Sequence, residues 1–150
     1  MSGFLKNRLY LSRTLDCVST DQTTEMMEYQ LSQPYASFKR YCKTLTLRDD
    51  PGLIEAYRKV HSPGETWPEI TRGMKEVGIL DMEIYIAGNR LFMIMDTLPD
   101  FDHDRAMQEL AGKPRQAEWE AYVAQFQDTS SEATADEKWH LMERIYKLDP

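Results

Sequence analysis

The stretch from Ile79 to Thr97 constrains the fold most, because it predicts two strands joined by a two-residue turn. Residues 79–86 alternate apolar and polar side chains, and residues 91–97 have the sequence LFMIMDT. Gly88-Asn89 lies between them, and this pair is favoured in hairpin turns because glycine accepts a positive φ at the first central position. We therefore predict two neighbouring antiparallel strands.

A helix that carries the best chemical candidates is predicted before this hairpin. Residues 50–60 begin with an aspartate that can cap free amides, and Pro51 falls in the first turn, where a missing N–H costs nothing. Tyr57 and His61 are four residues apart, so a helix places both on one face. Histidine titrates near neutral pH and often transfers protons. The alternatives are a solvent-facing histidine at a helix end and a tyrosine of the core.

A second helix is predicted directly after the first. The Ser-Pro-Gly sequence at 62–64 ends the first helix. Thr66 and Glu69 then have the spacing of a capping box, and Gly78 follows as the expected left-handed terminator.

The remaining periodicities complete the predicted order of elements. Residues 38–47 and 138–148 favour strands, whereas 102–112 and 114–127 favour helices. The order strand, helix, strand, strand, helix, strand is that of the ferredoxin-like plait, also called the split βαβ fold, in the α+β class. Because the segments 91–97 and 138–148 are apolar on both faces, we expect a second copy of the sheet to cover the uncovered face in a homodimer.

Composition restricts the partners and the location. The chain has 150 residues and a net charge of −7. Without a basic run it is not expected to bind nucleic acid, and without an apolar run of 18 residues it is not expected to enter a membrane. Cys17 and Cys42 make neither a disulfide framework nor a metal site, which favours a reducing compartment such as the cytoplasm.

The chain is predicted to have one folded domain, at residues 35–150, after a poorly ordered extension at residues 1–34. The extension has no sustained period. Its first fifteen residues contain basic but no acidic side chains, which loosely resembles an organelle transit peptide; a disordered extension is the alternative.

Five short sequences occur in an order and spacing that resemble one known family. They are Tyr57-x-x-x-His61, Trp67-Pro68-Glu69, Met82-Glu83-Ile84-Tyr85, Arg90-Leu91-Phe92 and Trp119. From about residue 40 to 148 the chain resembles the L-rhamnose mutarotase family. The resemblance implies a dimeric ferredoxin-like α/β barrel that interconverts the anomers of a 6-deoxy-L-sugar without a cofactor. It also implies that His61 acts as general acid, that Tyr57 contacts the sugar and that Trp119 lines the pocket.

Two positions depart from the rhamnose pattern within the expected sugar pocket. Met82 stands where relatives that act on rhamnose have a tyrosine, and Glu120 stands where they have a second tryptophan. Related sequences with a similar Asp-Met-Glu-Ile-Tyr stretch resemble proteins assigned to L-fucose, so we expect a 6-deoxy-L-hexose with a lean toward L-fucose. Asp81, Glu83 and a bound water all remain candidates for the general base.

Other functions and sites fit the sequence less well. The same dimeric barrel hosts cofactor-independent or haem-using monooxygenases, and a non-catalytic sugar-binding module is a second alternative. Carboxylates on the strand at 79–86 argue weakly against a monooxygenase. His103 lies in the sequence DFDHD, which is more typical of a solvated capping turn than of a metal site, and no metal is expected.

Overall fold

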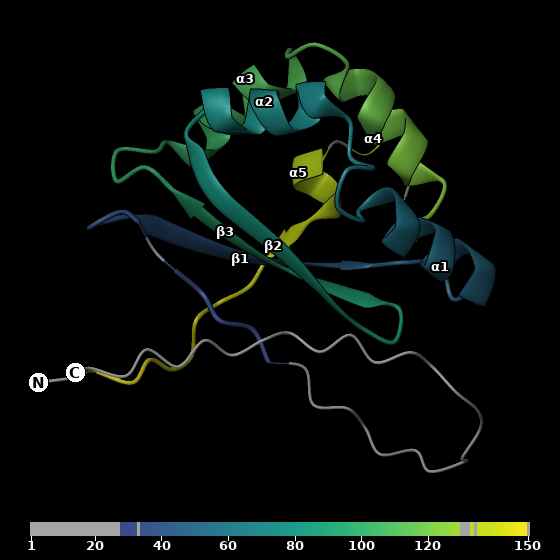
Figure 1. Cartoon of the computed structure of the whole chain (residues 1–150), viewed down its shortest axis with the longest axis horizontal. Helices are drawn as coiled ribbons and strands as arrows, with labels where there is room; N and C mark the ends of the chain where they lie inside the picture. Colours follow the sequence, from purple (N-terminus) through teal and green to yellow (C-terminus); the bar gives the residue numbers. More distant parts are fainter. Residues whose placement is uncertain (1–27, 33, 130–132, 134, 150) are drawn as a thin grey trace, which may run out of the picture. The chain divides into compact units, whose positions relative to one another are not determined.

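The structure is a computed structural model that describes residues 28–32, 34–129, 133 and 135–149 (Figure 1). The chain divides into two units, residues 1–33 and residues 34–150. The described residues 28–32 of the first unit form neither helix nor strand. Most of the predicted N-terminal extension, including its transit-like segment, lies outside the described residues.

The predicted hairpin is present in the second unit. Strands β2 (Ile79–Ala87) and β3 (Arg90–Thr97) pair antiparallel, with the last residue of β2 opposite the first residue of β3. Gly88 and Asn89 therefore form the whole turn, and Gly88 has the positive φ of 62° that its lack of a Cβ allows. The register shifts between Ile79 and Asp81, at the start of β2.

The sheet has four strands in the order β2-β3-β1-β4. Strand β1 (Lys39–Thr46) lies between β3 and the short strand β4 (His140–Leu141), and every neighbouring pair is antiparallel. The predicted α+β class and ferredoxin-like plait are confirmed. The same order puts β1 and β3 at the centre, where their side chains on one face form the floor of the core.

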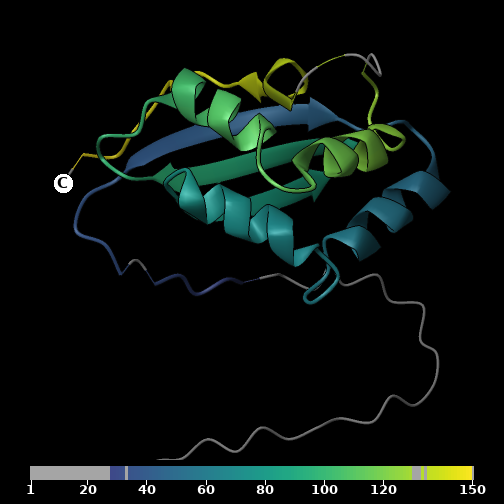
Figure 2. The same ribbon diagram turned by 90° about the horizontal axis from the view of Figure 1, so that it is seen from above.

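All the labelled helices lie on one face of this sheet (Figures 1 and 2). They are α1 (Pro51–Val60), α2 (Pro68–Glu76), α3 (His103–Ala111), α4 (Gln116–Ala124) and α5 (Ala135–Lys138). Asp50 caps α1 as predicted, because its carboxylate accepts the backbone N–H of Leu53 at 2.9 Å. The break between α1 and α2 at residues 62–64 is also present.

The predicted capping box before α2 is wrong. The N-cap of α2 is Trp67, whose side chain makes no capping hydrogen bond. The Thr66 hydroxyl instead donates to the carbonyl of Val60 at 3.5 Å, and Glu69 lies 3.6 Å from the guanidinium of Arg115. Contacts with neighbouring segments thus replace the local capping pattern.

The long strand predicted at residues 138–148 is also wrong. Lys138 ends helix α5, and strand pairing is limited to His140 and Leu141. The following residues pack little on the chain, since Ile145 and Tyr146 are 91% and 73% exposed. The apolar alternation here marks a surface that the chain does not bury by itself.

The core lies between the helices and the sheet in two clusters. One cluster is built around Leu45, Leu91 and Trp119, and the other around Met93 and Met95. Alternate residues of β1 and β3 supply the floor of both clusters, as strand geometry requires. One cavity is lined by residues of both clusters.

Candidate active site

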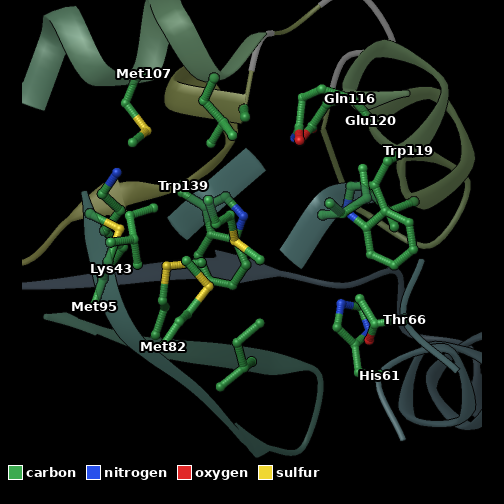
Figure 3. Close-up of a pocket in the computed structure, with 18 of the residues that line it drawn as sticks. Lys43, His61, Thr66, Met82, Met95, Met107, Gln116, Trp119, Glu120 and Trp139 are labelled. Atoms are coloured by element: carbon green, nitrogen blue, oxygen red, sulfur yellow. The ribbon is translucent and has the colours of Figure 1, made fainter. Parts of the chain in front are cut away.

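A small cavity lies between the sheet and the helices. Its volume is about 130 Å³, well below the roughly 300–1,000 Å³ of pockets for drug-sized ligands, so it suits a smaller molecule. Methionines from α2, α3, β2 and β3 form much of its apolar wall (Figure 3). Its polar lining residues are Lys43, Tyr57, His61, Thr66, Gln116, Glu120 and Gln127.

The end of α1 fixes the orientation of His61. His61 is the C-cap residue of α1, and its Nδ1 lies 2.9 Å from the backbone carbonyl oxygen of Tyr57. A carbonyl oxygen only accepts hydrogen bonds, so Nδ1 carries the proton and donates it. The Nε2 of a neutral ring is then an acceptor. Tyr57 also holds the ring by stacking, with centroids 4.2 Å apart and an interplanar angle of 31°.

Burial keeps this imidazole neutral. It lowers the pKa of His61 below its ordinary value, and the hydrogen bond to the Tyr57 carbonyl opposes that effect only in part. For Tyr57, burial and the nearby charge of Glu120 both raise the pKa of the phenol, which therefore stays protonated. At neutral pH the two side chains are an uncharged acceptor and an uncharged hydroxyl.

Glu120 enters the cavity from α4 and has two partners. The side-chain amide of Gln116 donates to its Oε1 at 3.0 Å, and the ammonium of Lys138 lies 4.0 Å from its Oε2. Burial raises the pKa of Glu120, whereas Lys138 and the Gln116 hydrogen bond act in the opposite direction. The carboxyl group is thus half-buried and paired with a lysine that is only 2% exposed.

Two buried amide oxygens lining the cavity have no hydrogen-bond partner in the described part of the chain. They are Oε1 of Gln116 and Oε1 of Gln127. An unsatisfied buried polar atom costs about 1–3 kcal/mol.

The structure brings together the predicted acid and the four residues predicted for the sugar pocket. Tyr57, His61, Met82, Trp119 and Glu120 all line the same cavity. The ring of Trp119 stands edge-on to His61, with centroids 5.5 Å apart. Trp67, which was part of the sequence resemblance, packs behind Trp119 at 5.3 Å and does not line the cavity.

The two carboxylates proposed from the sequence as general bases lie elsewhere. Glu83 is on the opposite face of β2 from Met82, because neighbouring residues of a strand point to opposite sides. There the hydroxyl of Tyr85 donates to it. Asp81 does not line the cavity but lines an adjoining hollow, to which His61, Thr66 and Met82 also contribute, and its carboxylate accepts the backbone N–H of Met82 at 2.9 Å.

Sequence reasoning missed five polar residues of the site, one of which, Thr66, was assigned to a capping box instead. Lys43 shares the inward face of β1 with Leu45, so strand alternation placed it toward the core. Gln116 lies one helical turn before Trp119, and this spacing was also visible. Gln127 follows α4 and gave no signal. Lys138 was missed because its segment was predicted as a strand.

Other kinds of site are not found among the described residues. No group of three His, Cys, Asp or Glu side chains there is arranged to hold a metal ion. His103 is paired with Asp104 at 3.0 Å and lies outside the cavity. None of the described helices has the length and apolar character needed to cross a bilayer.

The ferredoxin-like plait and its cavity define an α+β protein with a small-molecule site, and comparison with known proteins identifies the family. The model of the L-rhamnose mutarotase family matches residues 40–148. An L-fucose mutarotase of Xanthomonas campestris pv. campestris is 38% identical over 112 residues, which cover 75% of this chain and 90% of that protein. The chain therefore belongs to the L-rhamnose mutarotase family. The predictions of this family and of a sugar isomerase are confirmed.

More distant relatives agree with this assignment. An L-rhamnose mutarotase of Burkholderia ambifaria is 29% identical over 91 residues, which cover 59% of this chain and 82% of that protein. The crystal structure of L-rhamnose mutarotase FA22100 from Formosa agariphila has a TM-score of 0.55 and 19% identity, and the match covers 74% of this chain and 99% of that chain. At this identity the structural likeness shows the fold alone.

The hydrogen bond at His61 predicts a measurable titration. The imidazole should titrate below its unperturbed value of about 6.5 and carry its neutral-state proton on Nδ1. Because the unfolded chain then binds more protons than the folded chain, the stability linked to His61 is lost as pH falls below about 6.5. Nitrogen-15 NMR of labelled histidine measures both the midpoint and the tautomer. A midpoint above 6.5, or a proton on Nε2, would contradict this description.

Proposed function

We propose that the protein interconverts the α and β anomers of a 6-deoxy-L-hexose and prefers L-fucose to L-rhamnose. One observation carries the proposal: a cavity of small volume combines the oriented imidazole of His61 with the carboxyl group of Glu120 and the other polar side chains of its lining. The imidazole can move protons, and the polar side chains can form hydrogen bonds with sugar hydroxyls. The family assignment supports the same reaction.

The reaction needs only proton transfer and correct orientation. Opening the pyranose removes the proton from the anomeric hydroxyl and delivers one to the ring oxygen, and closing on the other face of the aldehyde gives the other anomer. In the proposed mechanism His61 transfers one of these protons. Its neutral Nε2 takes up a proton in one direction, and the resulting imidazolium gives it back as the general acid in the other.

The other predicted residues hold the sugar in this proposal. Tyr57 offers a hydroxyl that stays protonated, and Trp119 offers a ring face beside His61. Methionine side chains, with Met82 among them, form an apolar wall that fits a 6-methyl group. Discrimination between epimers must come from polar groups, because an apolar wall distinguishes hydroxyl orientation weakly. Glu120, Gln116 and Gln127 are the groups available for that purpose.

The preference for L-fucose has two supports. The relative assigned to L-fucose is 38% identical over 112 residues, whereas the relative assigned to L-rhamnose is 29% identical over 91 residues. In addition, Glu120 lies in the cavity where relatives acting on rhamnose are expected to have a tryptophan. A carboxylate can accept hydrogen bonds from an axial or equatorial hydroxyl in a way that an indole ring cannot.

Saturation-transfer NMR on equilibrated sugars tests this proposal. The protein should accelerate anomer exchange of L-fucose most, that of L-rhamnose less, and that of D-glucose least. His61→Gln should slow the exchange of L-fucose by about 10²–10⁴, the usual contribution of one proton-transfer group. His140→Gln, at an exposed histidine, is the matched control and should leave exchange unchanged.

Each outcome of this experiment separates the candidates. A faster exchange of L-rhamnose would overturn the fucose preference, and full activity in a folded His61→Gln protein would remove that residue from the mechanism. No acceleration of any sugar would favour the sugar-binding module. The monooxygenase alternative is not supported by the comparisons, which lead to mutarotases.

We also propose that the protein is a homodimer. The helices cover one face of the sheet, while Phe92 and Ile94 point to the other face and are only half-buried. The C-terminal segment adds Ile145 and Leu148, which are 91% and 79% exposed. A second copy of this surface would bury these side chains, and homodimers with a twofold axis are the commonest soluble oligomers.

Multi-angle light scattering on the purified protein tests the dimer. The mass at micromolar concentration should be twice that of one chain. Ile145→Asp should shift the mass toward the monomer because it puts a charge into the proposed interface. Arg72→Asp, on the exposed side of α2, is the control and should stay dimeric. A monomeric wild type at that concentration would overturn the proposal.

The cytoplasm is the location that we propose. The support is the cysteine content of the sequence, since two cysteines make no disulfide framework, as is usual for a reducing compartment.

A further inference from the structure

We infer that Glu120 is the second proton-transfer residue of the site, acting as the partner of His61, and that Lys138 is its positioning residue. This inference rests on the proposed function, since it assigns the residue that handles the other proton of ring opening. The sequence left that role open between Asp81, Glu83 and a bound water.

The lining of the cavity singles out Glu120. Among the described residues it is the one carboxylate that lines the cavity with His61. Glu83 points to the other face of the sheet. Asp81 lines a neighbouring hollow that His61 also lines, but its carboxylate accepts the backbone N–H of Met82 and it does not line the inner cavity. Mutarotation needs groups at two oxygens, O1 and O5 of the same ring. A second group must therefore share the cavity with His61.

The arrangement places the two groups on different sides of the cavity. His61 extends from the end of α1 and Glu120 from α4, with Trp119 beside both (Figure 3). The charge of Glu120 acts on the phenol of Tyr57, on which the ring of His61 stacks. A pyranose bound against Trp119 would thus have one proton-transfer group on each side.

Glu120 also has a route to solvent. It lines a larger groove, of about 680 Å³, between α3, α4 and α5 as well as the inner cavity. Its carboxyl group therefore lies where the two spaces meet. A proton-transfer residue needs such access, because its proton must equilibrate with water when no sugar is bound.

The two groups together balance the reaction. In ring opening, Nε2 of His61 takes the proton from the O1 hydroxyl, the C1–O5 bond breaks, C1=O1 forms, and the Glu120 carboxyl gives its proton to O5. After rotation about C1–C2, O5 attacks the other face of C1. Glu120 then takes the O5 proton and the His61 imidazolium returns a proton to O1. The pair begins and ends with one transferable proton.

The groups around Glu120 support the assumption that His61 and Glu120 together hold one transferable proton at working pH. Lys138 faces Glu120 from α5, Tyr57 and His61 face it from α1 and its end, and Lys43 lines the same cavity from β1. Asp104 of α3 lines the outer groove. Burial raises the pKa of Glu120 and lowers that of His61, which brings the two titrations closer together. A bell-shaped dependence of exchange on pH follows.

Lys138 acts through Glu120. Its side chain is 2% exposed and its ammonium lies 4.0 Å from Oε2, while the Gln116 amide donates to Oε1 at 3.0 Å. These two contacts hold the carboxyl group in place and keep part of its charge stabilised. Without Lys138 the pKa of Glu120 should be higher, because the opposite charge that lowers it is removed.

The test compares exchange of L-fucose and L-rhamnose in Glu120→Gln and in Glu118→Gln. Glu118 lies on the same helix with a side chain that is 64% exposed, so it is the matched control. Glu120→Gln should slow exchange by about 10²–10⁴ and reduce the bell-shaped pH profile to a single titration, while sugar affinity changes less. Glu118→Gln should match the wild type. Lys138→Met should move the acid limb of the profile to higher pH.

The results distinguish this inference from the proposed function. A wild type that accelerates neither sugar overturns the proposed function. An active wild type together with a Glu120→Gln protein of equal rate and unchanged pH profile overturns only the role of Glu120. If circular dichroism shows that Glu120→Gln is unfolded, the same measurements are made on Glu120→Asp. This variant keeps the carboxyl group but shortens the side chain by one methylene. Full activity with an unchanged profile in Glu120→Asp would overturn the inference, and a large loss in a folded protein would support it.

Discussion

The hydrogen bond from His61 Nδ1 to the carbonyl of Tyr57 is the contact on which the site depends, because it decides what the imidazole can do. The carbonyl of Tyr57, in the last turn of α1, accepts the backbone N–H of His61 at 3.3 Å and also its ring Nδ1–H at 2.9 Å. In doing so its ring is fixed in one tautomer, with Nε2 as an acceptor. The same residue therefore ends a helix and presents a proton acceptor, and burial keeps that acceptor neutral.

The fold provides the rest of the site by placing distant segments around this imidazole. The plait puts all the labelled helices on one face of the sheet, so α1, α4 and α5 meet over the floor formed by β1 and β3. Glu120 and Gln116 come from α4, and Lys138 comes from α5. The cavity remains small because methionine and tryptophan side chains fill the space around it. Its lining combines these apolar side chains with polar ones, among them His61 and Glu120.

Local patterns predicted most of the fold because local physics governs those elements. The Gly88-Asn89 turn and the Asp50 cap depend on a few neighbouring residues, and both formed as predicted. The segment 138–148 failed because its alternation of apolar residues does not reflect pairing within the chain. In the described part of this segment, His140 and Leu141 pair with β1, Met142 donates one backbone hydrogen bond to Cys42 at 2.8 Å, and Ile145 stays 91% exposed. Whether such a segment is a strand depends on contacts that a single sequence does not contain.

The residues of the site also divide into those that local patterns predict and those that depend on long-range contacts. Tyr57 and His61 were found by helical spacing, and Met82, Trp119 and Glu120 came from a family resemblance. All five meet in one cavity. Lys138 was missed because the C-terminal segment was predicted as a strand. Without knowledge of Lys138, the sequence suggested no role for Glu120 beyond contact with the sugar. Gln127 follows the end of α4, and its unpaired oxygen can be recognised only when the surrounding packing is known. Contacts between distant segments thus determine the charges around the site, whereas local spacing is enough to predict some of the residues in it.

The central claim is that two groups, His61 and Glu120, act on the two oxygens of one sugar ring. A crystal structure of the protein with the 6-deoxy-L-hexose that it exchanges fastest tests this claim most directly. The account predicts Nε2 of His61 and a carboxyl oxygen of Glu120 each about 2.6–3.2 Å from a different one of O1 and O5, with Gln116 or Gln127 accepting from another hydroxyl. A sugar that contacts His61 but leaves Glu120 out of reach of both oxygens would contradict it.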